Sequence, residues 1–226
     1  YSEKEVKDKT VWELFIKKDE KKEVENVFKQ LKSRDYPKEY ENYWLTKKRE
    51  ERLISWSNNV ILDEQEQIKY IVATGIDITE RKKQEEKLKK QKAYFEQLFN
   101  NSTEAIVLLD NNHQVLKINK KFESLFGFKE SELINKNLDN FILPDELFET
   151  GKKYTEKVKQ GEKVEGESIR KTKNGAKIYV SLQGFPIKLA NGQIGIYALY
   201  KDITERKKRE KQIEFLYFHD EMTRSE

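Results

Sequence analysis

Few side chains in this sequence are able to do acid–base or nucleophilic chemistry. His113 and His219 are the two histidines of the chain, and it contains no cysteine. These residues do not suggest a Ser/His/Asp arrangement or a metal–histidine cluster, and no glycine-rich phosphate-binding loop is present. His113 follows the turn sequence Asp-Asn-Asn, so we expect it to be a solvated polar residue. We therefore expect no enzymatic activity from this chain.

A charged string that occurs twice is more informative. Asp-Ile-Thr-Glu-Arg-Lys-Lys occupies residues 77–83 and returns unchanged at residues 202–208. Each copy follows an apolar, β-branched run and precedes a stretch rich in Lys, Glu and Gln, so each marks a strand that leads into a helix. Asp with Glu three positions later is a variant of the capping box, with Asp as the N-cap. A cap alone does not require seven identical residues, so the repeat indicates a duplicated module.

A strand that ends in Asp-Ile-Thr-Glu-Arg-Lys resembles the C-terminal motif of the PAS domain family. Gly127 followed by Phe128 resembles the glycine–aromatic pair that this family carries before its central helices. The resemblance covers nearly the whole chain and implies an α+β class, the PAS fold, with a five-stranded antiparallel sheet and flanking helices. It implies one complete and one N-terminally truncated copy joined by helical linkers. The expected parts are residues 1–78 (first PAS copy), 79–99 (linker helix), 100–203 (complete second copy), 204–218 (output linker helix) and 219–226 (start of a further domain).

Composition fits small modules joined by charged helices. Charged residues make up 38% of the chain, apolar residues 36% and aromatic residues 12%, and the aromatic content argues against disorder. The net charge of +4 arises from 45 basic and 41 acidic residues that are interspersed, so we expect no nucleic-acid partner. No apolar run is long enough to span a membrane, and the absence of cysteine fits a reducing, cytoplasmic compartment. Because the chain begins with Tyr, we expect a fragment whose parent could carry an upstream membrane anchor.

The first copy is expected to contain one helix and three strands. The helix runs to about Lys32, with an apolar stripe of Val24, Val27, Phe28 and Leu31. Asp35-Tyr36-Pro37 then ends the helix. The expected strands are residues 40–46, 52–62 and 68–76. These elements are the second half of a PAS module, so the first copy is expected to lack two strands, a short helix and half of its pocket walls.

The second copy is expected to be complete. A hairpin of residues 104–109 and 114–119 precedes a short helix capped by Asn119 and stopped by Gly127. Short helical pieces and a longer helix from Pro144 to Gly161 follow. Strands 162–171, 176–189 and 194–203 are joined by turns at Asn174-Gly175 and Asn191-Gly192.

A PAS module encloses a cavity between its sheet and its central helices, and strand alternation predicts the residues that face it. Two interpretations stay open, a small-molecule pocket or a filled core, with Tyr179 or Tyr200 as a polar handle in the first. The candidate pocket residues are Ile106, Leu108, Phe122, Leu125, Phe126, Ile178, Val180, Leu182, Ile196, Ala198 and Tyr200.

The cofactor is not identified by the sequence. A cysteinyl-flavin adduct is disfavoured because there is no cysteine, and haem is disfavoured because residues 146–160 contain no histidine. Non-covalent flavin or a small metabolite stays open. By the resemblance, Asp77 and Thr79, and likewise Asp202 and Thr204, would couple the sheet to the following helix and transmit a signal.

The two linkers share a register, since Leu88 and Ile213 lie equally far beyond the repeated string. In the first linker, Leu88, Gln91, Phe95 and Leu98 have heptad spacing. This spacing is compatible with a short coiled coil or with a solvated connecting helix. We expect a homodimer through these helices.

The C-terminal residues resemble the start of a GGDEF domain, the catalytic domain of diguanylate cyclases, because an apolar helix end precedes His219-Asp-Glu-Met-Thr223. Arg224-Ser225 depart from that motif. His219 could instead be the phosphoacceptor of a histidine kinase. We expect a sensory region that gates a diguanylate cyclase. The alternatives are the sensor region of a histidine kinase and a ligand-free protein-interaction module.

Overall fold

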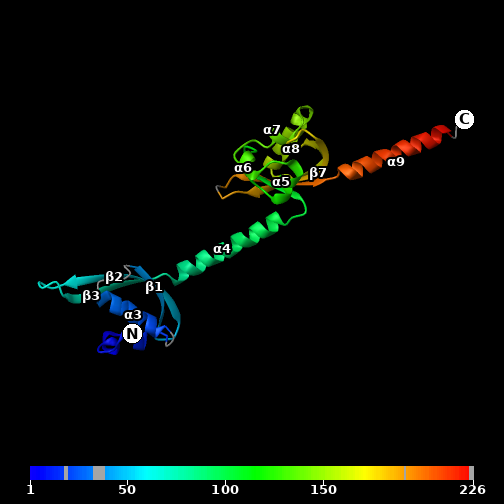
Figure 1. Cartoon of the computed structure of the whole chain (residues 1–226). Helices are drawn as coiled ribbons and strands as arrows, with labels where there is room; N and C mark the ends of the chain where they lie inside the picture. Colours follow the sequence, from blue (N-terminus) through cyan, green and yellow to red (C-terminus); the bar gives the residue numbers. More distant parts are fainter. Residues whose placement is uncertain (18–19, 33–38, 191, 224–226) are drawn as a thin grey trace. The chain divides into compact units, whose positions relative to one another are not determined.

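The structure, a computed structural model, describes residues 1–17, 20–32, 39–190 and 192–223, with the side chains of residues 27–29, 31–32 and 218–223 left undescribed. The chain divides into two compact units, Tyr1–Lys92 and Ala93–Glu226. Figure 1 labels their elements.

The first unit begins with three helices where the sequence predicted one. They are α1 (Glu3–Val6), α2 (Val11–Leu14) and α3 (Lys21–Lys32). Polar side chains that cap new helices explain why this segment is divided. Ser2 with Glu5 and Thr10 with Glu13 each form a capping box that starts a new helix, and Asp8 between them has a positive φ of 60°. Val24 of the predicted stripe is buried. The side chains of Val27, Phe28 and Leu31, and the predicted break at residues 35–37, lie outside what is described.

Three antiparallel strands form the sheet of the first unit, as predicted. They are β1 (Glu39–Leu45), β2 (Glu51–Leu62) and β3 (Ile68–Asp77), in the order β1-β2-β3. The sheet is followed by helix α4 (Thr79–Asn100). Aromatic rings pack on the sheet. Trp44 of β1 lies between Phe15, whose ring centroid is 4.7 Å away, and Trp56 of β2, at 4.5 Å. The Trp56 indole N–H donates to Asn42 Oδ1 at 2.8 Å, which satisfies two polar groups beside the stack.

Five antiparallel strands form the sheet of the second unit, in the order β5-β4-β8-β7-β6. The strands are β4 (Ala105–Leu109), β5 (Val115–Ile118), β6 (Val164–Lys171), β7 (Lys177–Lys188) and β8 (Ile194–Asp202). All five agree with the predicted strands to within a few residues. Gly175 and Gly192 have φ of 83° and 81°, so each supplies the left-handed conformation of its turn. Asn191, predicted in the second turn, lies outside the described residues.

Helices connect the hairpin β4–β5 to β6 in the second unit. They are α5 (Lys120–Phe126), α6 (Glu130–Leu133), α7 (Asp139–Ile142), the 3₁₀ turn η1 (Asp145–Leu147) and α8 (Phe148–Lys159). Gly127 ends α5 with φ of 80°, as predicted. The predicted single helix from Pro144 is corrected, because Pro144 precedes a 3₁₀ turn and the α-helix begins at Phe148. Helix α9 (Thr204–Thr223) follows β8.

Asn119 fixes the start of this helical segment and is fully buried. Its Oδ1 accepts the N–H groups of Phe122 at 2.8 Å and Ile106 at 2.9 Å, which confirms the predicted N-cap. Its Nδ2 donates to the carbonyl oxygens of Phe99 at 3.0 Å and Glu104 at 2.9 Å. One satisfied amide therefore joins the last turn of α4 to β4 and α5.

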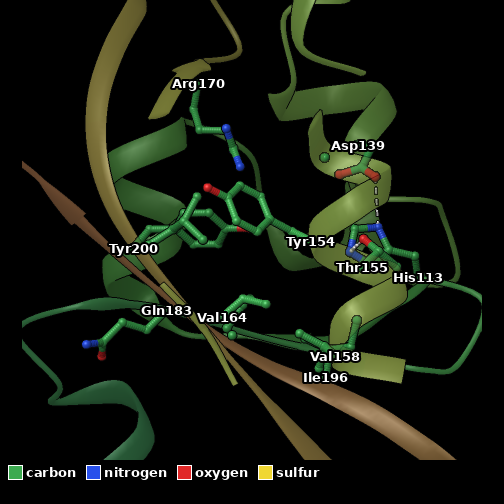
Figure 2. A pocket seen from close by; sticks show the side chains of 14 residues that line it. His113, Asp139, Tyr154, Thr155, Val158, Val164, Arg170, Gln183, Ile196 and Tyr200 are labelled. Atoms are coloured by element: carbon green, nitrogen blue, oxygen red, sulfur yellow. Dashed lines mark hydrogen bonds and ion pairs between the residues drawn. The ribbon is translucent and has the colours of Figure 1, made fainter. Parts of the chain in front are cut away.

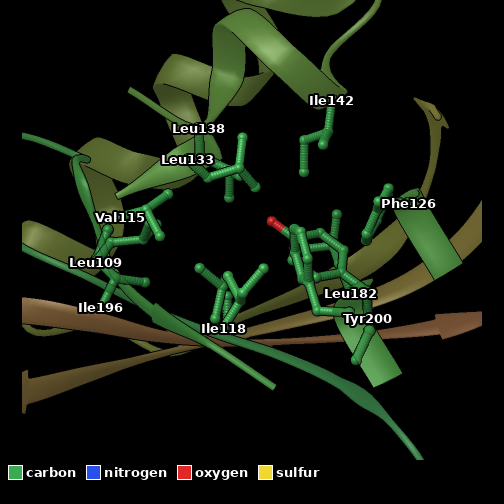
Figure 3. Packing of buried hydrophobic residues seen from close by; sticks show 14 of the residues in the cluster. Leu109, Val115, Ile118, Phe126, Leu133, Leu138, Ile142, Leu182, Ile196 and Tyr200 are labelled. Carbon is green, nitrogen blue, oxygen red and sulfur yellow. The ribbon is translucent and has the colours of Figure 1, made fainter. Parts of the chain in front are cut away.

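The core of the second unit lies between the inner face of the sheet and helices α5 to α8 (Figure 3). Large side chains from the helices fill it, among them Phe122, Phe126, Leu133 and Ile142, each fully buried. Tyr200 of β8 meets Phe126 edge to face, with ring centroids 5.5 Å apart. This close packing leaves little room inside the domain.

The elements of the first unit repeat the later elements of the second unit in the same order. Helices α3 and α8 both have 12 residues, and so do strands β2 and β7. Asp8 and Asn135, which follow α1 and α6, both have φ of 60°. Within the described part of the first unit, no counterparts of β4, β5 and α5 occur.

Candidate ligand pocket and strand-to-helix junctions

The repeated string forms the same hydrogen-bonded junction in both units. In the first, the Thr79 hydroxyl oxygen accepts the N–H of Leu53 on β2 at 2.7 Å, and the Ile78 N–H donates to the Leu53 carbonyl at 2.9 Å. In the second, the Thr204 hydroxyl accepts the N–H of Tyr179 on β7 at 3.0 Å. The Ile203 N–H donates to the Tyr179 carbonyl at 2.9 Å. The first residues of each helix are thus bonded to the strand next to the one they follow.

The aspartates act one position earlier than the sequence predicted. Helices α4 and α9 begin at Thr79 and Thr204, so Asp77 and Asp202 precede the N-cap. Their Oδ1 atoms accept the threonine N–H groups at 2.9 Å and 2.8 Å. The Thr79 hydroxyl also donates to Asp77, and these two bonds lower the pKa of Asp77.

The predicted reciprocal capping box is absent from the bonds described at these two junctions. The glutamates of the string bond to lysines on their own helices instead, Glu80 with Lys83 and Glu205 with Lys208. The aspartate and threonine, rather than the glutamate, therefore make the junction.

Ion pairs reinforce each junction from the outer strand of the sheet. Lys82 Nζ lies 3.1 Å from Glu41 on β1, and Lys207 Nζ lies 2.7 Å from Glu167 on β6. Arg206 also pairs with Glu167. Lys207 and Arg206 together lower the pKa of the Glu167 carboxyl group. Two basic side chains of α9 therefore pair with Glu167 on β6, whereas the ion pair described between α4 and β1 is that of Lys82 with Glu41.

A cavity of about 40 Å³ lies between α8 and the inner face of the five-stranded sheet in the second unit (Figure 2). This volume is enough for a few water-sized groups. It is far below the roughly 300–1,000 Å³ of sites for drug-sized ligands. The cavity as it stands therefore suits a small metabolite better than a flavin. Its lining residues are His113, Asp139, Gly151, Tyr154, Thr155, Val158, Val164, Arg170, Leu182, Gln183, Gly184, Ile196, Ala198 and Tyr200.

His113 lines this cavity, so the predicted solvated position is wrong. Its side chain is 12% exposed, with Nδ1 3.1 Å from Asp139 Oδ2 and Nε2 3.2 Å from Thr155 Oγ1. The fold thus brings together an aspartate, a histidine and a threonine that are distant in sequence. Nδ1 has no hydrogen-bond partner within the described residues despite its proximity to Asp139. The oriented Asp–His bond that a catalytic triad requires is therefore not formed.

Arg170 lies at the other end of the cavity, beside Tyr154 and Tyr200 (Figure 2). Only 4% of Arg170 is exposed. Its guanidinium carbon lies 5.9 Å from the centre of the Tyr200 ring. Burial raises the pKa of Tyr200, and the nearby Arg170 opposes that rise. One end of the cavity is thus cationic, while Asp139 lies at the other.

Four of the predicted pocket residues line the cavity, namely Leu182, Ile196, Ala198 and Tyr200. Phe122, Phe126 and Val180 are fully buried members of the core, and Leu125 and Ile178 pack against it. The inner residues of β4 are Ala105, Val107 and Leu109. Strand alternation therefore points Ile106 and Leu108 to the opposite face, which corrects their predicted orientation. Tyr179 also lies off the cavity, because its hydroxyl oxygen is 3.1 Å from Lys211 Nζ on α9.

The polar residues of the cavity were not predicted from the sequence. Arg170 lies in a strand with other charged residues, and Tyr154 and Thr155 lie in a helix rich in lysine, so none of the three stands out in the sequence. A weak signal was available for Arg170, because alternation in β6 places it on the same face as Val164 and Ser168. No pattern in the sequence relates His113 to Asp139 or Thr155.

The described ranges were searched for metal-binding clusters of side chains and for helices that could cross a membrane. Across residues 1–17, 20–32, 39–190 and 192–223, no group of three or more His, Cys, Asp and Glu side chains could hold a metal ion. None of the helices in these ranges has the length and apolarity needed to cross a membrane.

The five-stranded antiparallel sheet with short helices packed on one face defines an α+β domain, and comparison with known proteins names its family. The sequence model of the PAS domain family matches residues 1–80 and 103–205. The chain therefore belongs to the PAS domain family, as its repeated string suggested. The matched segments are PAS domains, which are not catalytic.

Individual relatives are more distant. The chain is 29% identical over 120 residues to the sensor protein TdiS of Thauera aromatica. That alignment covers 53% of this chain and 22% of the relative, so it spans about a fifth of that protein.

Solved structures that resemble the chain include two PAS domains. One is the PAS domain of an HTR-like protein from Haloarcula marismortui, 24% identical, with 54% of this chain and 99% of that chain covered and a TM-score of 0.48. The other is the PAS domain of a protein from Colwellia psychrerythraea, 26% identical, with 52% and 98% covered and a TM-score of 0.45.

Proposed function

We propose that this chain is the sensory and relay region of a longer signalling protein. In it, binding in the second unit changes the junction between β8 and α9, and α9 passes the change to a downstream diguanylate cyclase. The observation that carries this proposal is the repeated junction, in which Thr79 and Thr204 bond to the neighbouring strand in the same way. A relay requires a defined connection between sheet and output helix, and a population shift in β8 would act on that connection. The similarity to a protein named as a sensor supports the same role.

The first unit is proposed to be a copy of the same module that contains only its later elements. The matching order of elements and the shared helix and strand lengths support this. In the second unit, β4 pairs with β8. The corresponding edge of β3 has no partner strand within the described residues. The proposal therefore predicts that β3 accepts a further strand in the parent protein.

The output is proposed to be a diguanylate cyclase because the residues after α9 resemble the start of that catalytic domain. Helix α9 continues to Thr223 and so includes the backbone of His219, whose side chain lies outside the described residues. The rival is a histidine kinase in which His219 accepts phosphate. Incubating the parent protein with labelled ATP and, separately, with GTP distinguishes the two. Phosphate on His219 supports the kinase, and formation of cyclic di-GMP from GTP supports the cyclase.

A homodimer through the linker helices is proposed from their exposed apolar residues. Leu88, Phe95 and Leu98 of α4 are exposed, as are Ile213 and Leu216 of α9. Apolar side chains at helical spacing with no cover are typical of a coiled-coil seam. Sedimentation of the chain, with Ile213→Glu and Leu98→Glu as test variants and Lys90→Glu as control, would measure the dimer. A monomeric wild type would contradict this part. The region is proposed to lie in the cytoplasm.

The relay is tested by removing the junction from the parent protein. Thr204→Val keeps the shape of the side chain but removes the hydroxyl that accepts the Tyr179 N–H. Thr204→Ser is the matched control because it keeps the hydroxyl. We expect Thr204→Val, and more strongly Thr204→Val combined with Asp202→Ala, to uncouple cyclase output from the signal while basal catalysis persists. Unchanged signal-dependent output in the double variant would contradict the proposal. The alternative of a ligand-free interaction module predicts that no small molecule alters the melting of the second unit.

A further inference from the structure

Arg170 is a buried cation with incomplete hydrogen bonding. Its Nη1 donates to Ser168 Oγ at 2.7 Å and to the Ile169 carbonyl at 2.9 Å. Its Nε is buried and has no hydrogen-bond partner within the described residues. Buried polar groups are almost always paired, so an N–H of a guanidinium left without a partner beside a cavity needs an explanation.

No carboxylate neutralises Arg170. In the part of the chain that the structure describes, no ion pair involves Arg170. Asp139 lies beside His113, Asp145 pairs with Lys171, and Glu167 pairs with Arg206. Asp139 is the acidic residue of the cavity lining, and it lies at the opposite end with His113 (Figure 2). Burying an arginine without a counter-charge is unfavourable. A bound anion would supply the missing charge and offset this cost.

The geometry of the cavity limits what that anion could be. Its volume of about 40 Å³ accommodates a few heavy atoms. A guanidinium offers a planar fork that matches the two oxygens of a carboxylate. At the opposite end, Asp139 accepts hydrogen bonds, and the Thr155 hydroxyl and the His113 ring can donate or accept them.

We propose that this cavity binds a short carboxylate, anchored by Arg170, and favours acids that carry a hydroxyl or ammonium group to reach Asp139. This inference rests on the proposed function in that it assigns a ligand class to the cavity of the second unit. It distinguishes the second unit from the first, where strand register counted from the repeated string places Trp44 at the position of Arg170.

The test is a titration of the whole 226-residue chain, labelled with ¹⁵N, followed by two-dimensional NMR. The probes are acetate, glycolate and glycine, with acetamide as the neutral analogue of acetate and chloride as the ionic-strength control. We expect saturable shifts of the Arg170 Nε–H resonance with acetate, larger affinity for glycolate or glycine, and none with chloride. Dissociation constants on the order of 1–10 mM are expected, because so few atoms make contact. Equal binding of acetamide and acetate, or no saturable shift with any acid, would overturn the proposal.

Variants of Arg170 make the test specific. Arg170→Met fills a similar volume without charge and should weaken acetate binding at least tenfold. Arg170→Lys keeps the charge but loses the planar fork, so it should weaken binding by an intermediate factor. Lys171→Gln removes a positive charge from the next residue of β6, which faces the other way, and should leave affinity unchanged. If Arg170→Met does not fold, the acetate affinities of Arg170→Lys and Lys171→Gln are compared instead. Weaker binding in Arg170→Lys alone supports the proposal. Unchanged affinity in Arg170→Lys and Arg170→Met would overturn the role of Arg170.

Failure of this inference and failure of the proposed function give different results. If no carboxylate binds while the Thr204→Val variant uncouples output in the parent protein, the relay stands and the ligand class is wrong. If carboxylates bind through Arg170 while the junction variants leave output unchanged, the ligand site stands and the relay is wrong.

Discussion

At matching positions in the two sheets, the first unit places aromatic rings and the second places an arginine, a tyrosine and a cavity. Strand register defines the match. Asp77 pairs with Ile54 and Asp202 pairs with Val180. Counting back from these pairs, Trp44 corresponds to Arg170, Trp56 to Leu182 and Gly75 to Tyr200.

The same comparison shows what stayed alike between the two units. Thr79 and Thr204 bond to the same strand position, Leu53 in one unit and Tyr179 in the other. Glu41 and Glu167, which pair with matching lysines, also occupy matching register positions opposite Ser55 and Ser181. The interiors of the two units differ while their junctions match, which is expected if the junction serves the proposed relay and the interior serves selectivity.

The largest predicted effect tests whether the aromatic stack is the core of the first unit. Trp56→Ala removes the ring that contacts Trp44 and whose indole N–H donates to Asn42 Oδ1. We expect a loss of about 3 kcal/mol in the free energy of unfolding of the first unit, with the second unit unaffected. Denaturation followed by NMR signals of each unit would measure it. Tyr43→Ala, at an exposed position of the neighbouring strand β1, is the control. Equal effects of the two variants would show that the stack is not a core.

Loss of the threonine hydroxyl at the junction should lower the free energy of unfolding by a similar amount in both units. Thr79→Val and Thr204→Val each leave a strand N–H, at Leu53 or Tyr179, without its partner. We expect a loss of about 1–3 kcal/mol in each unit, visible as faster amide exchange at Leu53 and Tyr179. The serine variants should restore slow exchange. A large effect in one unit and none in the other would show that the two junctions are not equivalent.

Gly75 tests the difference in side-chain volume between the units. A Cβ at Gly75 would lie 2.7 Å from Ile54 Cγ2 and from ring carbons of Trp56, whereas the second unit accommodates the whole side chain of Tyr200 at the matching position. We expect Gly75→Ala to cost roughly 1–2 kcal/mol in the first unit through overpacking. Thr74→Ala, at the adjacent exposed position, should change stability by less than about 0.5 kcal/mol. Thermal denaturation of both variants measures this, and a neutral Gly75→Ala would mean that the stack adjusts freely.

The smallest predicted effect is the pH dependence of the ion pairs at the second junction. Because the pKa of Glu167 is lowered in the folded protein, its contribution is present above the ordinary glutamate value of about 4.3. It is lost as pH falls through the lowered value. We expect Glu167→Gln to speed amide exchange in the first turn of α9 near pH 7, and this difference from wild type to shrink below about pH 4. Glu41→Gln should have a weaker effect on α4, because among the described residues Glu41 pairs with Lys82 alone. A difference independent of pH would show that Glu167 acts without its charge.

The strands, most of the helices and the position of the junction could be predicted from the sequence alone. Alternating apolar residues defined the strands, Asn119 and Gly127 bounded α5, and the repeated string located both strand-to-helix transitions. These are local features, in which a few adjacent residues decide the backbone. Local rules also misplaced some details, such as the single N-terminal helix that two capping boxes divide and the aspartates that precede the N-cap.

The composition of the cavity could not be predicted from the sequence, because it depends on the tertiary fold. His113, Asp139, Thr155 and Arg170 come from a turn, two helices and a strand, and no spacing in the sequence relates them. Alternation gave the faces of β7 and β8 correctly but not that of β4, where a run of apolar residues is buried on both sides and hides which face is inner. The tertiary structure also decided that a charged Arg170 is buried, because burial depends on which side chains from α7, α8 and β8 converge on it. Local sequence specifies backbone conformation, whereas the chemistry of a pocket depends on contacts between residues far apart in the chain.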